Sequence, residues 1–173
     1  MASAAAQVTL KGNPIHLTGQ VPIVHTKAPD FHLVDKDLKD RTLHEFNGKR
    51  KLLSTVPSLD TGTCSKMTKH INEFAKKHPD FVFITVSADL PFAQKRFCEH
   101  EGAHNIHTFS MMRNKDFGKS YGLLVQDGPL AGLLARALFV LDEKDHILYL
   151  ELVSEITQEP NYHKAFEVLQ GHR

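Results

Sequence analysis

The chain has 173 residues, of which 41% are hydrophobic and 24% charged, and its formal net charge is +1. This length and balance suit one globular domain with a sizeable core, and the charge gives no reason to expect a nucleic acid or an anionic membrane as a partner. Two cysteines are too few for a secreted disulfide scaffold, so they are either free thiols or a reversible redox pair. No stretch approaches the ~20 apolar residues of a membrane span. Because residues 1–7 lack the pattern of a secretory signal, we expect a cytoplasmic protein.

The first third of the chain is predicted to be rich in β structure. Residues 7–10 and 15–18 are short alternating runs around a Gly-Asn-Pro turn, which is typical of a β-hairpin. Residues 31–34 alternate as a strand does, with residues 38–43 as a partner strand. Residues 51–56 form an apolar run that indicates a buried strand.

The stretch after this buried strand places Cys64 at the start of a helix. Pro57 ends the strand because it has no donor for a sheet ladder, and the polar residues that follow supply turn and N-cap chemistry. Residues 64–77 carry apolar side chains at the spacing of one helical face. A thiol in the first turn lies beside free N–H groups and the positive end of the helix dipole, and both favour the thiolate. Cys64 is therefore a candidate nucleophile, although an inert buried cysteine is the commoner case.

The remaining elements predict a mixed sheet with helices on both faces. Residues 81–87 form a strand, and Asp89 is expected to cap the following helix, which has Pro91 in its first turn and contains Cys98. Strand, helix and strand in succession imply a parallel βαβ unit. The later elements are a strand at 106–110, a short helix at 116–122 ending at glycine, a loop at 128–134, an antiparallel pair at 135–141 and 147–153, and a closing helix at 161–170.

Two motifs resemble one known family. Pro57-x-x-x-Thr61-x-x-Cys64 resembles the peroxiredoxin signature, and the run from Val56 to Thr61 followed by Cys64 is similar to that of the bacterial thiol peroxidases. Residues 127–137, DGPLAGLLARA, closely resemble the second signature of that subfamily. The resemblance extends from about residue 8 to 170. It implies one thioredoxin-like domain over residues 1–173, with an N-terminal hairpin at about 7–18, and an antioxidant, thiol-dependent peroxidase.

The resemblance also implies a role for each matching residue. Cys64 would be the peroxidatic cysteine, Thr61 and Arg136 would hold the peroxide, and Pro57 would form a wall of the pocket. Cys98 occupies the position of the resolving cysteine, which implies an intramolecular disulfide with Cys64. Cysteines at a helix start and on the next helix are not expected to begin within the ~7 Å between Cα atoms that a disulfide needs, so at least one helix would have to unwind locally.

The residues alone leave alternatives open at these positions. Arg136 opens an apolar strand, which is costly for a cation without a role or a partner, and it could instead pair with a surface carboxylate. Thr61 could serve as a plain N-cap, and Cys98 could be a core cysteine packed beside Phe97. Arg113 is a weaker candidate, because the subfamily usually has an acidic residue near Met111 that is absent here.

The resemblance implies hydrogen peroxide and alkyl hydroperoxides as substrates, thioredoxin as the reductant and a homodimer, with no metal, haem or flavin. Apolar side chains near the second signature suggest that organic peroxides fit; they are Met111, Met112, Leu130 and Leu133. Among 12 histidines, His100, His104 and His107 have helical spacing, but Gly102 and Asn105 interrupt that helix, so we interpret them as surface residues.

Two rival functions use the same residues differently. A disulfide-exchange protein or redox sensor would use both thiols without consuming peroxide, but the chain has no Cys-x-x-Cys motif. A binding domain with inert thiols would use neither cysteine. Neither rival needs both Thr61 and Arg136 beside Cys64.

Overall fold

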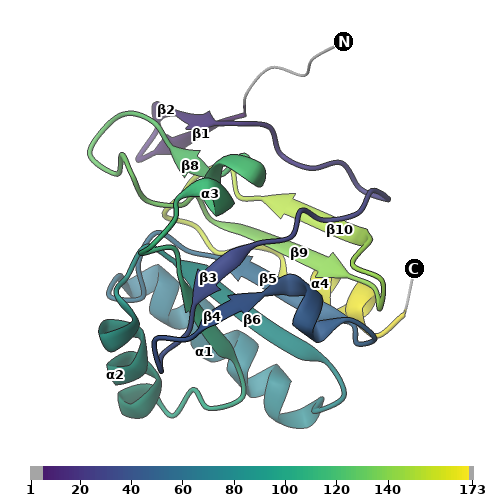
Figure 1. Cartoon of the computed structure of the whole chain (residues 1–173). Helices are drawn as coiled ribbons and strands as arrows, with labels where there is room; N and C mark the ends of the chain where they lie inside the picture. The colour runs from purple at the N-terminus through teal and green to yellow at the C-terminus, as the bar shows by residue number, and fades with distance from the viewer. Residues whose placement is uncertain (1–5, 172–173) are drawn as a thin grey trace.

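The computed structural model describes residues 6–171, and its centre is a seven-stranded sheet in the order β10-β9-β5-β6-β7-β3-β4 (Figure 1). The strands are β3 (His32–Val34), β4 (Asp40–Thr42), β5 (Lys51–Thr55), β6 (Val82–Ser87), β7 (His107–Ser110), β9 (Ala137–Leu141) and β10 (Ile147–Leu152). β5, β6 and β7 are parallel, whereas β9, β10, β3 and β4 join in antiparallel pairs. The predicted mixed sheet and its parallel βαβ unit are confirmed.

A second, smaller sheet carries the N-terminal hairpin. β1 (Gln7–Leu10) and β2 (Asn13–Thr18) pair in antiparallel fashion, as predicted, and the turn between them has positive φ at Lys11 and Gly12. The third strand, β8 (Leu124–Val125), pairs with β2 and was not predicted. A strand of two residues is too short to show an alternating pattern.

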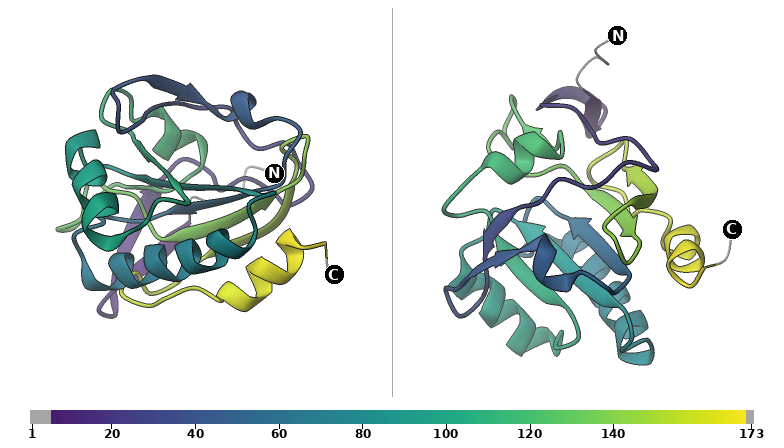
Figure 2. Two further views of the ribbon diagram at one scale, coloured as in Figure 1. Left: turned by 90° about the horizontal axis from the view of Figure 1, so that it is seen from below. Right: turned by 45° about the vertical axis from the view of Figure 1, so that its right-hand side comes forward.

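The helices lie on both faces of the large sheet (Figure 2). α1 (Gly62–Lys77) and α4 (Tyr162–Leu169) lie on one side, where α2 (Pro91–Glu101) shares their core cluster, and α3 (Asp116–Ser120) lies on the other. A short 3-10 helix, η1 (Leu43–Phe46), follows β4. Neighbouring strand residues point to opposite faces, so Leu52 packs toward α1 whereas Leu53 joins the cluster on the α3 side. No helix within residues 6–171 is long and apolar enough to span a membrane.

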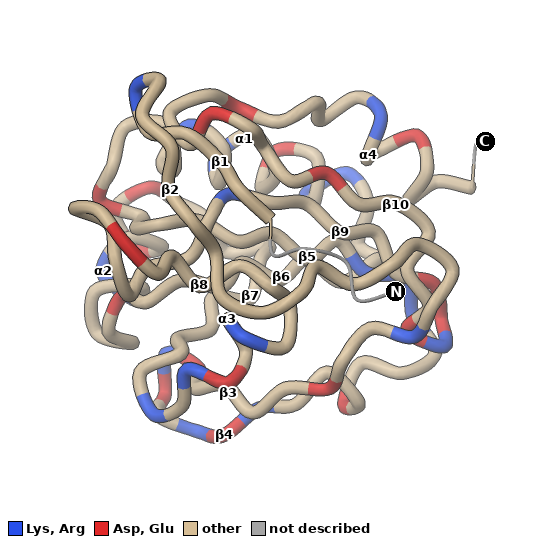
Figure 3. The backbone as a smooth tube through the Cα atoms, turned by 90° about the horizontal axis from the view of Figure 1, so that it is seen from above, with Lys and Arg blue, Asp and Glu red and all other residues tan. Residues whose placement is uncertain are grey.

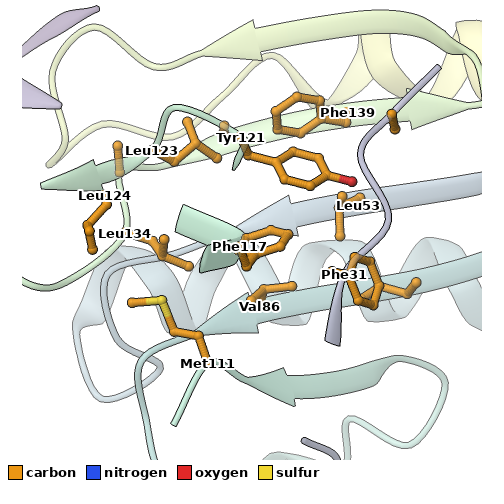
Figure 4. Packing of buried hydrophobic residues seen from close by; sticks show 14 of the residues in the cluster. Phe31, Leu53, Val86, Met111, Phe117, Tyr121, Leu123, Leu124, Leu134 and Phe139 are labelled. Carbon is orange, nitrogen blue, oxygen red and sulfur yellow. The ribbon is translucent and has the colours of Figure 1, made fainter. Parts of the chain in front are cut away.

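The cluster on the α3 side combines aliphatic side chains with several aromatic rings (Figure 4). Phe117 meets Phe31 edge to face at 5.8 Å between ring centroids, and Tyr121 meets Phe139 in the same way at 5.4 Å. The Tyr121 hydroxyl donates a hydrogen bond of 2.6 Å to the carbonyl oxygen of Pro29, and burial raises the pKa of this phenol. Gly122 follows α3 and has a φ of +66°. A Cβ at this position would lie 2.3 Å from the carbonyl carbon of Gln20, so the glycine that was predicted to end this short helix is required here.

Two predicted element starts differ from the structure. β9 begins at Ala137, so Arg136 lies just before the strand rather than inside it. The predicted capping of α2 by Asp89 was wrong, because Leu90 holds the N-cap position and makes no side-chain cap bond. Asp89 lies one residue too early to cap the helix, and its carboxylate instead accepts hydrogen bonds from Ser58 and from the Leu59 amide.

One ion pair is buried where β5 begins. Lys51 is fully buried and its ammonium group contacts the carboxylate of Asp145, which is 4% exposed, in the turn between β9 and β10. The same ammonium group donates to the carbonyl oxygen of Asp142 at 3.3 Å. Elsewhere acidic and basic residues are interspersed over the chain (Figure 3). The pair therefore differs from ordinary surface charges, because either partner alone would be a buried, uncompensated charge.

Asp145→Asn is expected to lower the free energy of unfolding by about 3 kcal/mol, because Lys51 would lose its countercharge in the interior. Asparagine tolerates the positive φ of 68° at this position, so the backbone is not the cause. Chemical denaturation measures the change. The double variant Lys51→Met/Asp145→Asn should recover at least half of the loss, and a single-variant loss below about 1 kcal/mol would contradict the interpretation.

Candidate active site

Cys64 lies in the first turn of α1, as the third residue of the helix after the N-cap Thr61. Its sulfur is fully buried, in the core cluster formed by α1, α2, α4 and the sheet. The first turn is tied to the neighbouring loop, because the hydroxyl of Thr63 donates to the carbonyl oxygen of Thr157 at 3.0 Å. Cys64 therefore lies at the N-terminus of α1 and is enclosed by the surrounding protein.

The guanidinium of Arg136 contacts the Cys64 sulfur. Arg136 is 2% exposed, and its Nη2 donates to Cys64 Sγ at 3.2 Å. None of the ion pairs within residues 6–171 includes Arg136. A buried cation without a carboxylate partner is energetically unfavourable, and among the three contacts of this guanidinium the Cys64 sulfur is the one that can become an anion. The structure thus brings together the two residues that the separate motifs singled out.

Two partners that sequence reasoning missed fix the orientation of this guanidinium. Its Nε donates to the carbonyl oxygen of Ile156 at 3.0 Å, and its Nη1 lies 3.6 Å from the Sδ atom of Met67. Met67 was recognised only as an apolar residue of the helical face, one turn after Cys64. A backbone carbonyl gives no sequence signal at all. Together with the Cys64 sulfur, they hold the planar guanidinium at three points, which a lysine ammonium group could not match.

The segment that contains Ile156 is itself held by the N-terminal hairpin. The Ile156 amide donates to the carbonyl oxygen of Thr9 at 2.9 Å, and the Glu155 carboxylate accepts from the Gly12 amide at 2.9 Å and from the Thr9 hydroxyl at 3.1 Å. Glu155 also accepts from the amide and hydroxyl of Thr157. The bonds to Thr157 and Gly12 lower the pKa of Glu155 to about 2, so it is ionised at neutral pH. The hairpin therefore supports the loop to which Arg136 and Thr63 are bonded.

Thr61 and Pro57 lie in the loop between β5 and α1. Thr61 holds the N-cap position but does not cap the helix with its side chain. Its hydroxyl donates instead to the carbonyl oxygen of Ser58 at 3.1 Å and is exposed, so the oxygen keeps lone pairs for another donor. Pro57, in the same loop, is buried. A groove of about 280 Å³ opens beside the loop, between α1 and α2, and it is lined by Leu59, Asp60, Thr61, Gly62, Ser65, Arg96, Phe97, His100 and Glu101.

Cys98 is the second thiol, on α2, and is 6% exposed. Its sulfur lies 3.9 Å from the Thr108 hydroxyl on β7. Burial raises the pKa of the Cys98 thiol, and the contact with Thr108 opposes that shift in part. Cys98 also lines a second cavity, of about 370 Å³, with charged residues of the β3–β4 region. Its surroundings therefore favour the neutral thiol over the thiolate.

The two sulfurs are free thiols and contact opposite parts of the sheet. Cys64 meets Arg136 beside β9, whereas Cys98 meets Thr108 on β7. Because β5 and β6 lie between these strands, the strands themselves are roughly 14 Å apart at the usual ~4.8 Å spacing. A direct disulfide would thus need a local rearrangement, as the sequence analysis anticipated.

Three weaker candidates have other surroundings. Arg113 is paired with Asp40 at 2.6 Å and donates to the carbonyl oxygen of Leu38 at 3.1 Å, so it braces the β3–β4 turn. Met111 is buried in the cluster on the α3 side, not in the cluster that contains Cys64. Gly102 ends α2 in the left-handed conformation, as its interruption of the histidine pattern indicated. Within residues 6–171, no group of three His, Cys, Asp or Glu side chains could hold a metal ion.

Arg136→Met in a Cys98→Ser background is expected to slow alkylation of Cys64 by iodoacetamide at neutral pH by about tenfold or more, because the thiolate loses its cation. The matched control is Arg113→Met, which removes an exposed arginine that pairs with Asp40 beside the β3–β4 turn and should leave the rate unchanged. Circular dichroism checks folding, and Arg136→Gln, which also removes the charge, serves if the methionine variant is unfolded. Equal rates in folded variants would contradict the proposed charge pairing.

Cys98 in a Cys64→Ser background is expected to alkylate with a midpoint above pH 8.5, the ordinary thiol value. Burial favours the neutral thiol, so the reactive thiolate forms only at higher pH. Thr108→Val should move the midpoint further up, because the Thr108 contact lowers the pKa of Cys98. A midpoint at or below the ordinary value would show that the thiol is not desolvated in solution.

Comparison with known proteins connects this geometry to a family. Residues 23–166 match the redoxin family, and the chain is 48% identical to the thiol peroxidase of Leptospira interrogans over 92% of this chain and 94% of that protein. A peroxiredoxin-like protein from Aquifex aeolicus has 41% identity and a TM-score of 0.90, covering 95% of this chain and 96% of that one. The thiol peroxidase from Chromobacterium violaceum has 25% identity and a TM-score of 0.88, covering 95% of each chain. The expected thioredoxin-like fold is confirmed, and the chain belongs to the thiol peroxidases, peroxidase oxidoreductases of the redoxin family.

Proposed function

We propose that this chain reduces hydrogen peroxide and organic hydroperoxides at Cys64 in a two-electron reaction. The observation that carries this proposal is the 3.2 Å contact between Cys64 Sγ and the guanidinium of Arg136. This guanidinium is buried and forms no ion pair with a carboxylate of residues 6–171. A thiolate is the nucleophilic form of cysteine, and a neighbouring cation favours it. The position of Cys64 in the first turn of α1 adds the helix dipole in the same sense.

The first step transfers one oxygen atom to sulfur. The Cys64 thiolate attacks the terminal peroxide oxygen, the S–O bond forms as the O–O bond breaks, and the leaving oxygen takes up a proton to depart as water or an alcohol. Sulfur is thereby oxidised to sulfenic acid. Arg136 stabilises the charge that develops on the breaking bond. Thr61 donates its own proton to Ser58, so its oxygen accepts a hydrogen bond from the peroxide, while buried Pro57 keeps water from the sulfur.

The second step returns the enzyme toward the thiol state. The Cys98 thiol condenses with the sulfenic acid of Cys64, which forms an intramolecular disulfide and releases water. An external dithiol then reduces this disulfide by exchange, and we propose thioredoxin in that role. The separation of the strands that flank the two sulfurs requires the first turn of α1, part of α2, or both, to unwind before the bond forms. A homodimer and a cytoplasmic location stay predictions of the family resemblance.

Peroxide consumption with thioredoxin as the reductant tests the proposal. Wild type should turn over with both peroxide classes, Cys64→Ser should be inactive, and Cys98→Ser should complete one oxidation of Cys64 without thioredoxin-linked turnover. The reason is that Cys64 makes the bond to oxygen, whereas Cys98 only resolves the product. Activity of Cys64→Ser would contradict the assignment. If wild type exchanges disulfides but consumes no peroxide, a disulfide-exchange function replaces it.

A further inference from the structure

Asp89 bonds to both of the loops that lead to the two cysteines. Its carboxylate accepts from the Ser58 hydroxyl at 2.6 Å and from the Leu59 amide at 2.8 Å, both in the loop between β5 and α1. It also accepts from the Ser87 hydroxyl at 2.7 Å, at the end of β6. No ion pair within residues 6–171 includes Asp89, so its charge is balanced by hydrogen bonds alone.

The network continues from Asp89 into the helix that carries Cys98. Gln94 is fully buried on α2, four residues before Cys98. Its Nε2 donates to the Ser87 hydroxyl at 3.0 Å and to the carbonyl oxygen of Phe109 at 2.9 Å. The backbone carbonyl of Asp89 accepts from the Ser110 hydroxyl at 2.6 Å. A chain of hydrogen bonds therefore runs from the loop before Cys64, through Asp89, to the α2 helix before Cys98.

This arrangement links the two segments that carry the cysteines. The loop before Cys64 cannot move independently of the start of α2 while the Asp89 carboxylate accepts bonds from Ser58 and Leu59. The Gln94 Oε1 atom is buried without a hydrogen-bond partner among residues 6–171. The packing of α2 against the sheet therefore includes the free-energy cost of one desolvated acceptor. Unwinding of α2 would hydrate that atom, and the Asp89 network opposes this release.

We propose that Asp89 is a positioning residue that holds the β5–α1 loop and α2 in the reduced arrangement, and thereby limits the rate of Cys64–Cys98 disulfide formation. This inference rests on the proposed function, in which Cys98 resolves the sulfenic acid. After Cys64 is oxidised, the sulfenic acid either condenses with Cys98 or reacts with a second peroxide to give sulfinic acid. A firm Asp89 network prolongs the sulfenic state and favours the second outcome.

The test follows Cys64 after a pulse of hydrogen peroxide, with acid quenching and mass spectrometry to separate thiol, disulfide and sulfinic acid. In Asp89→Asn, an amide NH₂ replaces one acceptor oxygen and the charge is lost. Disulfide formation should accelerate by at least about threefold, the ratio expected for one net hydrogen bond. The sulfinic fraction at high peroxide should fall by a similar factor. Unchanged disulfide formation in Asp89→Asn would overturn the proposal.

Two controls separate this role from general loss of stability. Asp145→Asn weakens the fold where β5 begins, at the other end of the strand from the Asp89 contacts, and should leave the partition between disulfide and sulfinic acid as in wild type. Ser58→Ala should act like Asp89→Asn, and the two changes together should have less than their summed effect because they break one contact. If Asp145→Asn shifts the partition equally, the effect is global and the proposal fails.

Failure of the proposed function itself has a different signature. If wild type forms sulfenic acid but no Cys64–Cys98 disulfide, then Cys98 is not the resolving thiol. In that case the rates for Asp89→Asn have no disulfide to report, and the resolving role of Cys98 is rejected together with the role of Asp89, whereas peroxide reduction at Cys64 stands. If wild type forms the disulfide and Asp89→Asn forms it at the same rate, only the role of Asp89 is rejected.

Discussion

The contact between Cys64 and Arg136 is the interaction on which the rest of the site depends. Both groups are buried, at 0% and 2% exposure, and a guanidinium in such a place is tolerated only when its donors and its charge are matched. The carbonyl oxygen of Ile156 and the sulfur of Met67 take up two donors, and the Cys64 sulfur takes the third. The fold thus supplies donors in advance at the place where the proposed peroxide cleavage would develop charge.

That preorganisation depends on elements that are distant in the sequence. α1 follows β5, Arg136 directly precedes β9, and β5 and β9 are neighbours in the sheet. The loop that carries Ile156 comes after β10 and is bonded to the N-terminal hairpin. Cys98 lies outside this group, against β7. The same sheet therefore places Arg136 beside Cys64, whereas Cys98, although it belongs to the same core cluster, contacts β7.

The sequence predicted the parts of this site that have local signals. The proline and turn residues before Cys64 indicated a helix start, and Arg136 was conspicuous because a cation precedes an apolar run. Asp89 shows where such reasoning fails. An aspartate near Pro91 fits a helix cap, but its acceptors are used by Ser58 and Leu59, about 30 residues away. Backbone acceptors such as the carbonyl of Ile156 cannot be recognised from residue types, because every residue has a carbonyl group. β8 has too few residues to show the alternating hydrophobic pattern of a strand.

The hydrogen bonds of Glu155 connect the N-terminal hairpin to the loop that positions Arg136 in the candidate active site. From the Gly12 amide to the Arg136 guanidinium, the path consists of a carboxylate, one peptide unit and two hydrogen bonds. A shift of the hairpin turn is therefore transmitted to the cation beside Cys64 without passing through the large sheet. Substitutions in the turn at Gly12 are for this reason not confined in their effect to the hairpin, whereas α4 makes none of these bonds.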